Sequence, residues 1–330
     1  MRPFPSVAAP WGRAAILSLI LSLAAAAGAV AAPPPDRRLA LTVDDLPWVP
    51  LPEVPTAEVL PGHRRLVAAV ARAGVPVVGF VNEGKLEDRG RIDPERLQML
   101  RDWRDAGAEL GNHSYGHSDL HAVGLAAYQA DILRGERQLK ALTDEKSQPA
   151  PRWFRHPYLR AGRSVEDKAA LQAFLAEHGY RIAPVTVDNA DWIWAGAYLR
   201  LDQRGDARLK ARLRRDYLRY MGAKLDYYER QSIALLGYNL PQVWLIHANL
   251  LNADAYGELI AMARKRGYRF VGLDEALRDR AYQRADAYLG PAGPSWLHRW
   301  AIGERKPPTF FAGEPETPDW VLNLAGVESE

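Results

Sequence analysis

Short apolar runs alternate with amphipathic stretches along this chain, and glycine often separates the two. Seven runs have the composition of buried β-strands: residues 39–43, 75–81, 108–110, 153–154, 181–187, 242–246 and 269–271. Several of the helical stretches between them end at a glycine just before the next run, as at Gly74, Gly107, Gly179 and Gly267. Glycine adopts the left-handed conformation of a helix end at little cost. The alternation predicts serial β–α units in one parallel sheet or barrel.

Two of the predicted helices have clear start signals. Asp93 is followed by Pro94, which combines an N-cap residue with proline at the first helical position. Ser164 lies three residues before Asp167, which is the spacing of a capping box. These signals support helices before the third and fifth predicted strands.

The chain has three further regions that affect its domain organisation. Residues 196–240 are rich in Arg, Leu and Tyr, and they predict a long helical insertion between the fifth and sixth strands. We expect residues 33–280 to form one barrel that includes this insertion. Residues 281–330 contain a tail rich in Pro, Gly and Trp, and we expect a C-terminal extension packed on the barrel.

The first 32 residues have the pattern of an export signal. Arg2 and Arg13 supply positive charge, residues 14–30 are rich in Leu and Ala, and residues 29–31 offer a small-x-small cleavage site. An uncleaved membrane anchor fits the same residues, because the apolar run approaches the length of a membrane span. We expect an exported protein, periplasmic or extracellular, with a membrane tether if the segment is retained.

The amino-acid composition limits which metal ligands and partners are possible. The 330 residues include no cysteine, which excludes disulfides and thiolate metal sites, so a metal would depend on His, Asp and Glu. Without residues 1–32 the chain has 41 basic and 40 acidic residues, and we expect no nucleic-acid partner. The sequence does not indicate an oligomeric state.

Polar side chains collect where the predicted strands end: Asp44, Asp45, His113, Arg155, Asp188, Asp191 and His247. In a parallel barrel the carboxyl ends of the strands open on one face, where active sites are found. Each residue alone has a structural explanation, such as a strand terminator, an ion-pair partner or a core histidine. Together they predict a metal site surrounded by catalytic groups.

Histidines four residues apart provide the candidate metal ligands. His113 and His117 can bind one metal ion if the backbone turns between them. His121 extends the series, so the spacing alone leaves open which pair binds the metal.

Five ordered segments resemble the motifs of the polysaccharide deacetylase family, also called carbohydrate esterase family four. The resemblance covers roughly residues 39–275. The segments are Thr42-Val43-Asp44-Asp45, His113-Ser114-Tyr115-Gly116-His117, Arg155-His156-Pro157-Tyr158, Asp188-Asn189-Ala190-Asp191-Trp192 and Leu245-Ile246-His247.

This resemblance implies a distorted (β/α)7 barrel and a divalent metal, usually zinc. The implied ligands are Asp45, His113 and His117, which leaves His121 without a role. The implied substrate is an acetylated polysaccharide or oligosaccharide.

The resemblance also implies roles for the remaining polar residues. Asp44 would be the general base and His247 the general acid. Arg155 would orient Asp44 and lower its pKa, while Asp191 would hold the ring of His247 and raise its pKa.

The resemblance also implies substrate contacts, and the sequence departs from the family pattern at a few positions. Tyr158 and Trp192 would offer flat faces for a sugar ring, and the backbone N–H of Tyr158 would help to hold the oxyanion. Val43 and Leu46 replace the usual aromatic residue and glycine around the aspartate pair, and His156 replaces a small residue or proline. We expect Leu46, His156 and the 196–240 insertion to reshape the cleft.

The resulting hypothesis is a secreted, metal-dependent deacetylase that hydrolyses the N-acetyl groups of a glycan. An O-acetyl esterase of the same family and a catalytically silent carbohydrate-binding protein are the alternatives. The residues do not distinguish between N- and O-acetylated substrates.

Overall fold

The computed structural model describes residues 36–146, 150 and 152–330, and the unit Pro35–Glu330 is compact. The predicted export signal or anchor at residues 1–32 lies outside the described residues. Within the described part, we find no helix whose length and apolar character would let it cross a membrane.

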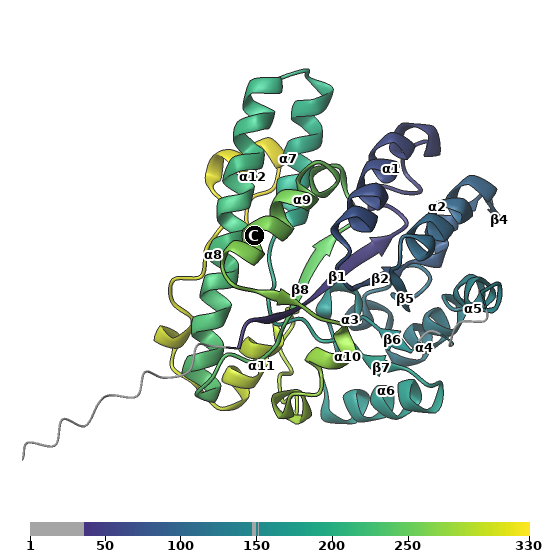
Figure 1. The fold of residues 1–330 in the computed structure, drawn as a ribbon. Coiled ribbons are helices and arrows are strands. Elements are labelled where there is room, and N and C mark those ends of the chain that lie inside the picture. The colour runs from purple at the N-terminus through teal and green to yellow at the C-terminus, as the bar shows by residue number, and fades with distance from the viewer. Residues whose placement is uncertain (1–35, 147–149, 151) are drawn as a thin grey trace, which may run out of the picture. The chain divides into compact units, whose positions relative to one another are not determined.

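Seven parallel strands form the central sheet of the described residues (Figure 1). They are β1 (Arg38–Leu46), β2 (Val77–Val81), β5 (Glu109–Asn112), β6 (Trp153–Phe154), β7 (Arg181–Ile182), β8 (Gln242–His247) and β9 (Arg269–Phe270). Their order is β7-β6-β5-β2-β1-β8, and β9 pairs with the start of β1. The chain after β7 reaches the other end of this sheet, where the N–H of Val187 donates to the carbonyl of Val243 at 2.9 Å. Val187 also pairs with Trp244 of β8, which closes the sheet into a distorted barrel. The predicted fold class is confirmed.

Helices surround the strands, and a short hairpin follows β2 (Figure 1). The helices are α1 (Thr56–Ala73), α2 (Pro94–Asp105), α3 (Leu120–Val123), α4 (Leu125–Arg134), α5 (Arg137–Asp144), α6 (Val165–Glu177), α7 (Asp191–Gln203), α8 (Ala207–Leu236), α9 (Leu250–Lys265), α10 (Leu273–Ala276), α11 (Trp296–Gly303) and α12 (Asp319–Ala325). The hairpin consists of β3 (Glu87–Asp88) and β4 (Arg91–Ile92).

The two predicted helix starts have the expected caps. The carboxylate of Asp93 accepts hydrogen bonds from the backbone N–H groups of Glu95 and Arg96 at the start of α2. The hydroxyl of Ser164 accepts from the N–H of Asp167 at the start of α6. These bonds satisfy donors that a helix start would otherwise leave unpaired.

The boundaries of β1 and of the predicted insertion differ from expectation. β1 continues through both aspartates to Leu46, because Asp44 still pairs with His247 of β8. The predicted helical stretch is two helices, α7 and α8, and α7 already begins at Asp191. The start of α7 therefore belongs to the strand-end face.

The segment after α10 contacts the barrel directly. The N–H of Trp296 donates to the carbonyl of Val185 at 2.7 Å, and α12 packs against α7. Four large apolar side chains of this segment belong to the main hydrophobic core: Trp296, Leu297, Trp300 and Val321.

Candidate active site

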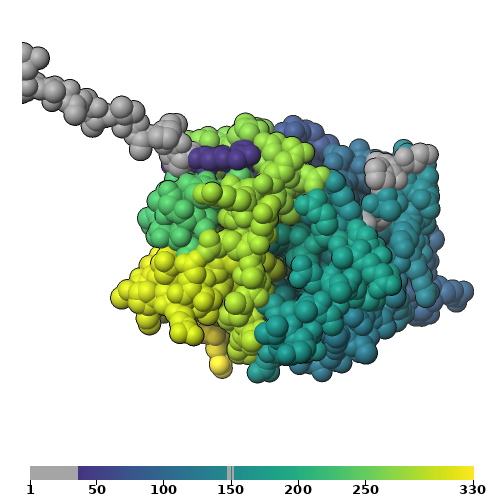
Figure 2. Space-filling model, turned by 90° about the horizontal axis from the view of Figure 1, so that it is seen from below, coloured from purple at the N-terminus to yellow at the C-terminus, as the bar shows by residue number. Residues whose placement is uncertain are grey.

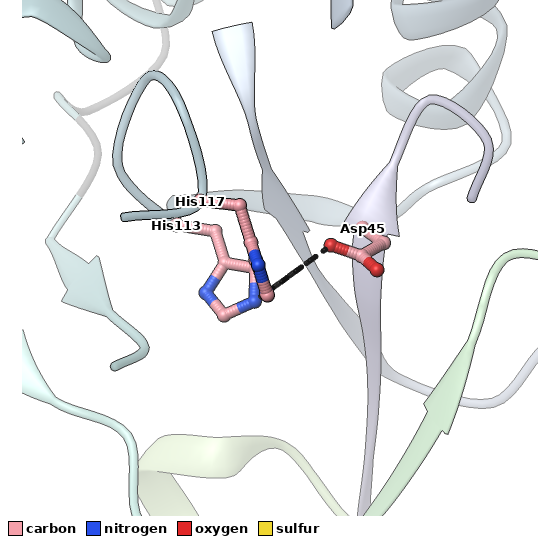
Figure 3. A group of neighbouring side chains, drawn as sticks. All are labelled: Asp45, His113 and His117. Carbon is pink, nitrogen blue, oxygen red and sulfur yellow. Dashed lines mark ion pairs between the residues drawn. The ribbon is translucent and has the colours of Figure 1, made fainter. Parts of the chain in front are cut away.

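Asp45, His113 and His117 form a compact cluster at the carboxyl ends of β1 and β5 (Figure 3). Their candidate ligand atoms all lie within 4.8 Å of one another. Oδ1 of Asp45 is 4.0 Å from Nε2 of His113 and 3.7 Å from Nε2 of His117. Two imidazoles and a carboxylate are a common donor set for zinc. The cluster contains the three residues that the family pattern implies and does not include His121.

Unusual backbone conformations position this cluster. Asp45, Ser114 and His117 have φ angles of 67°, 64° and 53°, in the left-handed region that non-glycine residues rarely occupy. Such conformations persist only where the surroundings hold them, and they concentrate at functional sites. In the 113–117 loop they turn the backbone so that both imidazoles face Asp45 (Figure 3).

The tautomer of His113 follows from its hydrogen bond. Its Nδ1 lies 2.8 Å from the carbonyl oxygen of Arg155, which can only accept, so Nδ1 carries the proton. Burial lowers the pKa of His113 well below its usual value, which keeps the ring neutral. Nε2 therefore presents a lone pair to the cluster, as a metal ligand must.

Asp45 is held in the ionised form. Burial alone would raise the pKa of this carboxyl, but the ammonium of Lys85, 3.5 Å from Oδ1, and the neighbouring histidines lower it below the usual value. Oδ1 is buried, yet it has no hydrogen-bond partner among the described residues. An ionised, buried oxygen whose one charged neighbour is 3.5 Å away, and which faces two imidazole nitrogens, fits a site for a cation.

Asp44 lies beside the cluster and is almost fully buried. Nη1 of Arg155 is 3.4 Å from its Oδ2, and Nη2 of Arg155 donates to the hydroxyl of Thr42 at 3.0 Å. Burial raises the pKa of Asp44 to about 6, although the charge of Arg155 acts to lower it. Arg155 therefore acts on this pKa in the expected direction, but desolvation outweighs the ion pair.

His247 forms a tight pair with Asp191 at the start of α7. Its Nδ1 is 2.6 Å from Oδ1 of Asp191, and its backbone N–H donates to Oδ2 at 2.8 Å. The side chain of Asn252 also donates to Oδ2, at 2.7 Å. Burial alone would lower the pKa of His247, but the carboxylate of Asp191 raises it to about 9. His247 is therefore protonated at neutral pH, as expected for a general acid.

Two exposed aromatic residues border the site. Tyr158 is 54% exposed, and its ring centroid lies 4.5 Å from that of His117. Trp192 is 49% exposed in the first turn of α7, next to Asp191. Flat, exposed rings beside a polar site offer stacking surfaces, and the sugar-binding role of both residues stays a prediction.

Leu46 and His156, two of the positions expected to reshape the cleft, are both buried. Leu46 is fully buried, and a Cβ at Gly79 of β2 would overlap its side chain. His156 is 1% exposed, packs edge-on against Phe154 and lies 3.2 Å from the hydroxyl of Tyr128. Their effect on the shape of the cleft stays a prediction.

Sequence reasoning missed several residues that hold the site. Lys85 contacts Asp45, Thr42 contacts Arg155, and Asn252 contacts Asp191. The side chain of Asn82 donates to the carbonyl of His113 at 2.6 Å. Asn82 directly follows β2, so the strand-end argument that selected Asp44 would also have selected it.

Comparison with known families matches residues 31–182 to the model described as polysaccharide deacetylase. This match confirms the resemblance to that family, and its span includes the first three motifs but ends before Asp191 and His247. No curated protein matches the chain.

Several solved structures are similar to this chain at low identity. A chitin deacetylase from Colletotrichum lindemuthianum is 21% identical, with 78% of this chain and 94% of that chain covered and a TM-score of 0.46. A family 4 carbohydrate esterase from Streptomyces lividans is 20% identical, with 72% and 93% covered and a TM-score of 0.44. A family 4 pseudoenzyme from Bacillus anthracis is 16% identical, with 73% and 66% covered and a TM-score of 0.47. At these TM-scores the matches do not bear on activity or substrate.

Proposed function

We propose that this protein is an exported, metal-dependent deacetylase that hydrolyses N-acetyl groups of a polysaccharide or oligosaccharide. One observation carries the proposal. A cluster of two neutral histidines and a carboxylate lies beside two further residues that differ in protonation state at neutral pH, the ionised Asp44 and the protonated His247. Asp45, His113 and His117 are the proposed ligands, and the donor set favours zinc. Asp44 and His247 are the proposed base and acid.

The residues of the chain divide the proton transfers between them. The chemistry that a bound divalent metal supplies is polarisation of the acetyl carbonyl and acidification of a water. Asp44 takes the proton of the attacking water, while Arg155 keeps its carboxylate in place. His247 donates its proton to the leaving nitrogen, because an amine leaves poorly unless it is protonated. Asp191 holds the ring and stabilises its charged form.

The turn at Pro157–Leu159 supplies the last group of the proposed mechanism. Its hydrogen bonds run from Leu159 N to His156 O and from Arg160 N to Pro157 O, so the turn does not use the N–H of Tyr158. In our proposal this N–H stabilises the oxyanion of the tetrahedral intermediate.

An O-acetyl esterase would use the same groups, and a silent binding protein is the competing class. The Asp44–Arg155 and His247–Asp191 pairs favour turnover, because carbohydrate binding alone requires neither a buried base nor a protonated acid. The N-terminal pattern supports export, and a retained segment would tether the protein to a membrane.

The test is acetate release by the purified protein on panels of N-acetylated and O-acetylated glycans, with zinc and then with a chelator. We expect release from an N-acetylated glycan that the chelator abolishes and zinc restores. Asp44→Asn should lower kcat by about 100-fold or more while glycan binding survives.

His121→Ala provides a matched control for His117→Ala, because His121 lies four residues further along and outside the cluster. We expect only His117→Ala to lose bound metal. A wild-type protein that binds zinc and glycan but releases no acetate from any panel member would exclude the enzyme and favour the binding protein.

A further inference from the structure

The turn that carries Tyr158 has an unusual backbone. Tyr158 and Leu159 are consecutive non-glycine residues with φ angles of 56° and 53°. Residues with a side chain rarely adopt this conformation, because it brings Cβ close to the backbone. Contacts from outside the turn must therefore hold it.

Arg299 of α11 provides one such contact. Its side chain is buried, and Nη2 donates to the carbonyl oxygen of Leu159. Nε donates to the carbonyl of Pro294 at 2.9 Å, and Nη1 to Oδ2 of Asp286 at 3.0 Å. The guanidinium also stacks over the ring of Trp296, 4.4 Å from its centroid. One planar group thus joins the turn to three points of the C-terminal segment.

Gly293 provides the second contact, through its lack of a side chain. A Cβ at this position would overlap the carbonyl oxygen of Tyr158 and lie 2.9 Å from its carbonyl carbon. Both neighbours are backbone atoms, so they cannot move aside as a flexible side chain would. The backbone of residue 293 therefore lies directly against that of Tyr158.

The C-terminal segment also contacts the barrel elsewhere, where the N–H of Trp296 donates to the carbonyl of Val185. A groove separates it from α6, lined by Leu171 and Leu175 on one wall and by Tyr282 and Leu289 on the other (Figure 2). Lys168 of α6 crosses the groove to Asp286 at 2.6 Å. Beside this groove, Arg299 and Gly293 form the local contact between the segment and the Tyr158 turn.

We propose that the segment 286–299 positions Tyr158 for the reaction, with Arg299 as a positioning residue that acts through the carbonyl of Leu159. The expected effect on kcat rests on the proposed function, whereas the expected effect on the order of the turn does not. The attachment fixes the direction of the Tyr158 N–H and the place of its ring beside His117. Arg299 itself contacts none of the proposed metal ligands or proton carriers.

Two variants test the attachment from different directions. Arg299→Met removes the bond to Leu159, and Gly293→Ala forces the backbones apart without a change of charge. Arg104→Met is the matched control, because Arg104 is also buried and bonds a carbonyl, that of Leu142, and two carboxylates far from the turn. Gly303→Ala is the second control, since its Cβ would meet only Ala287 at an ordinary 3.4 Å.

The first readout does not depend on activity. The amides of Leu159 and Arg160 are bonded within the turn, so hydrogen exchange of a peptide spanning residues 156–162 reports its order. We expect exchange about 10-fold faster or more in Arg299→Met and Gly293→Ala, and unchanged in the two controls. Equal exchange in all four variants would overturn the attachment.

The second readout separates positioning from general destabilisation. We expect Arg299→Met and Gly293→Ala to lower kcat about 10- to 100-fold with KM and zinc affinity nearly unchanged, because an oxyanion donor acts in the transition state. Arg299→Lys should recover part of the loss. Faster exchange with an unchanged kcat would overturn the functional part of the inference. Absence of acetate release by the wild type would refute the proposed function, while the exchange experiment would still decide the attachment.

Discussion

Asp44 and His247 occupy paired positions on β1 and β8, yet their surroundings give them opposite protonation states. Burial raises the pKa of Asp44 to about 6. Against burial, Asp191 raises the pKa of His247 to about 9. Between these values one group is ionised and the other protonated, as general base and general acid catalysis require. Neighbouring charge and solvent access, more than residue type, assign the two roles.

Asp191→Asn should shift the alkaline side of the pH profile. The proposed acid must be protonated, so activity falls as pH rises through the pKa of His247. Removal of the Asp191 carboxylate leaves burial as the main influence and lowers that pKa, so the fall should move to lower pH by about 1 to 3 units. The measurement is kcat/KM against pH, together with an NMR titration of the His247 ring. The acidic side, set by Asp44, serves as the internal control, and an alkaline side at the wild-type pH would contradict the assignment.

The residues proposed to perform chemistry were easier to predict than the residues that hold them. Acid, base and metal ligands have restricted residue types, so Asp45, His113 and His247 could be selected from their positions at strand ends. Lys85 and Arg299 could not be selected in this way, because neither of them directly follows a predicted strand. Arg299 also lies far from the motifs in sequence, and only the fold brings it to Leu159.

A carboxylate from a distant segment of the chain caps the first turn of α5. The N-cap residue of α5, Glu136, makes no side-chain cap, but Oε1 of Glu83 accepts from the N–H of Leu139 at 2.7 Å. Glu83 is 3% exposed, and burial raises its pKa from the usual 4.5 to about 7. This carboxyl joins the segment after β2 to the first turn of α5.

Glu83→Gln should remove a pH dependence of stability. The folded protein binds the Glu83 proton more tightly than the unfolded chain, so this contribution to stability is complete below pH 4.5 and is lost as pH rises through about 7. The loss amounts to roughly 3 kcal/mol at 1.36 kcal/mol per pKa unit. Urea unfolding of wild type and Glu83→Gln between pH 4 and 8 measures the difference. If the difference between the two proteins stays constant across this range, the raised pKa is excluded.

Elements were predicted well where local signals were strong. The caps at Asp93 and Ser164 and the glycine ends identified α2 and α6 because each signal acts within one helical turn. The helices α3, α4 and α5 were not predicted, and α5 depends on Glu83 from a distant segment for its cap. α11 and α12 lie in a tail rich in proline and glycine, where packing on the barrel outweighs local preference.

At the scale of the whole molecule, the proposed metal would link segments that are distant in the chain. Asp45 belongs to β1, and His113 and His117 belong to the loop after β5. A ligand that binds only the folded protein stabilises it, by about 2.7 kcal/mol at 100 times its Kd. We expect zinc to raise the Tm, a chelator to reverse the rise, and His117→Ala to abolish the response. His121→Ala should keep it, and a zinc response that persists in His117→Ala would place the metal elsewhere.

One hydroxyl adds to the backbone hydrogen bonds that close the seam between β8 and the segment after β7. The hydroxyl of Thr186 accepts from the N–H of Val243 at 2.7 Å, where the ladder between the two segments would otherwise leave this donor unpaired. Asp188 and Asp191 follow this seam on one side, and β8 ends at His247 on the other. The register of the seam therefore affects the pairing of Asp191 with His247.

Thr186→Val tests this closure because valine keeps the shape of threonine and removes the acceptor. An unpaired buried N–H costs about 1–3 kcal/mol, so we expect a loss of that size in the free energy of unfolding by urea. Thr186→Ser retains the hydroxyl and is the matched control, with a smaller loss from the missing methyl group. If the seam also positions the acid, Thr186→Val should lower the NMR-measured pKa of His247, whereas Thr186→Ser should not. Equal stability of the two variants would show that the barrel closes without this bond.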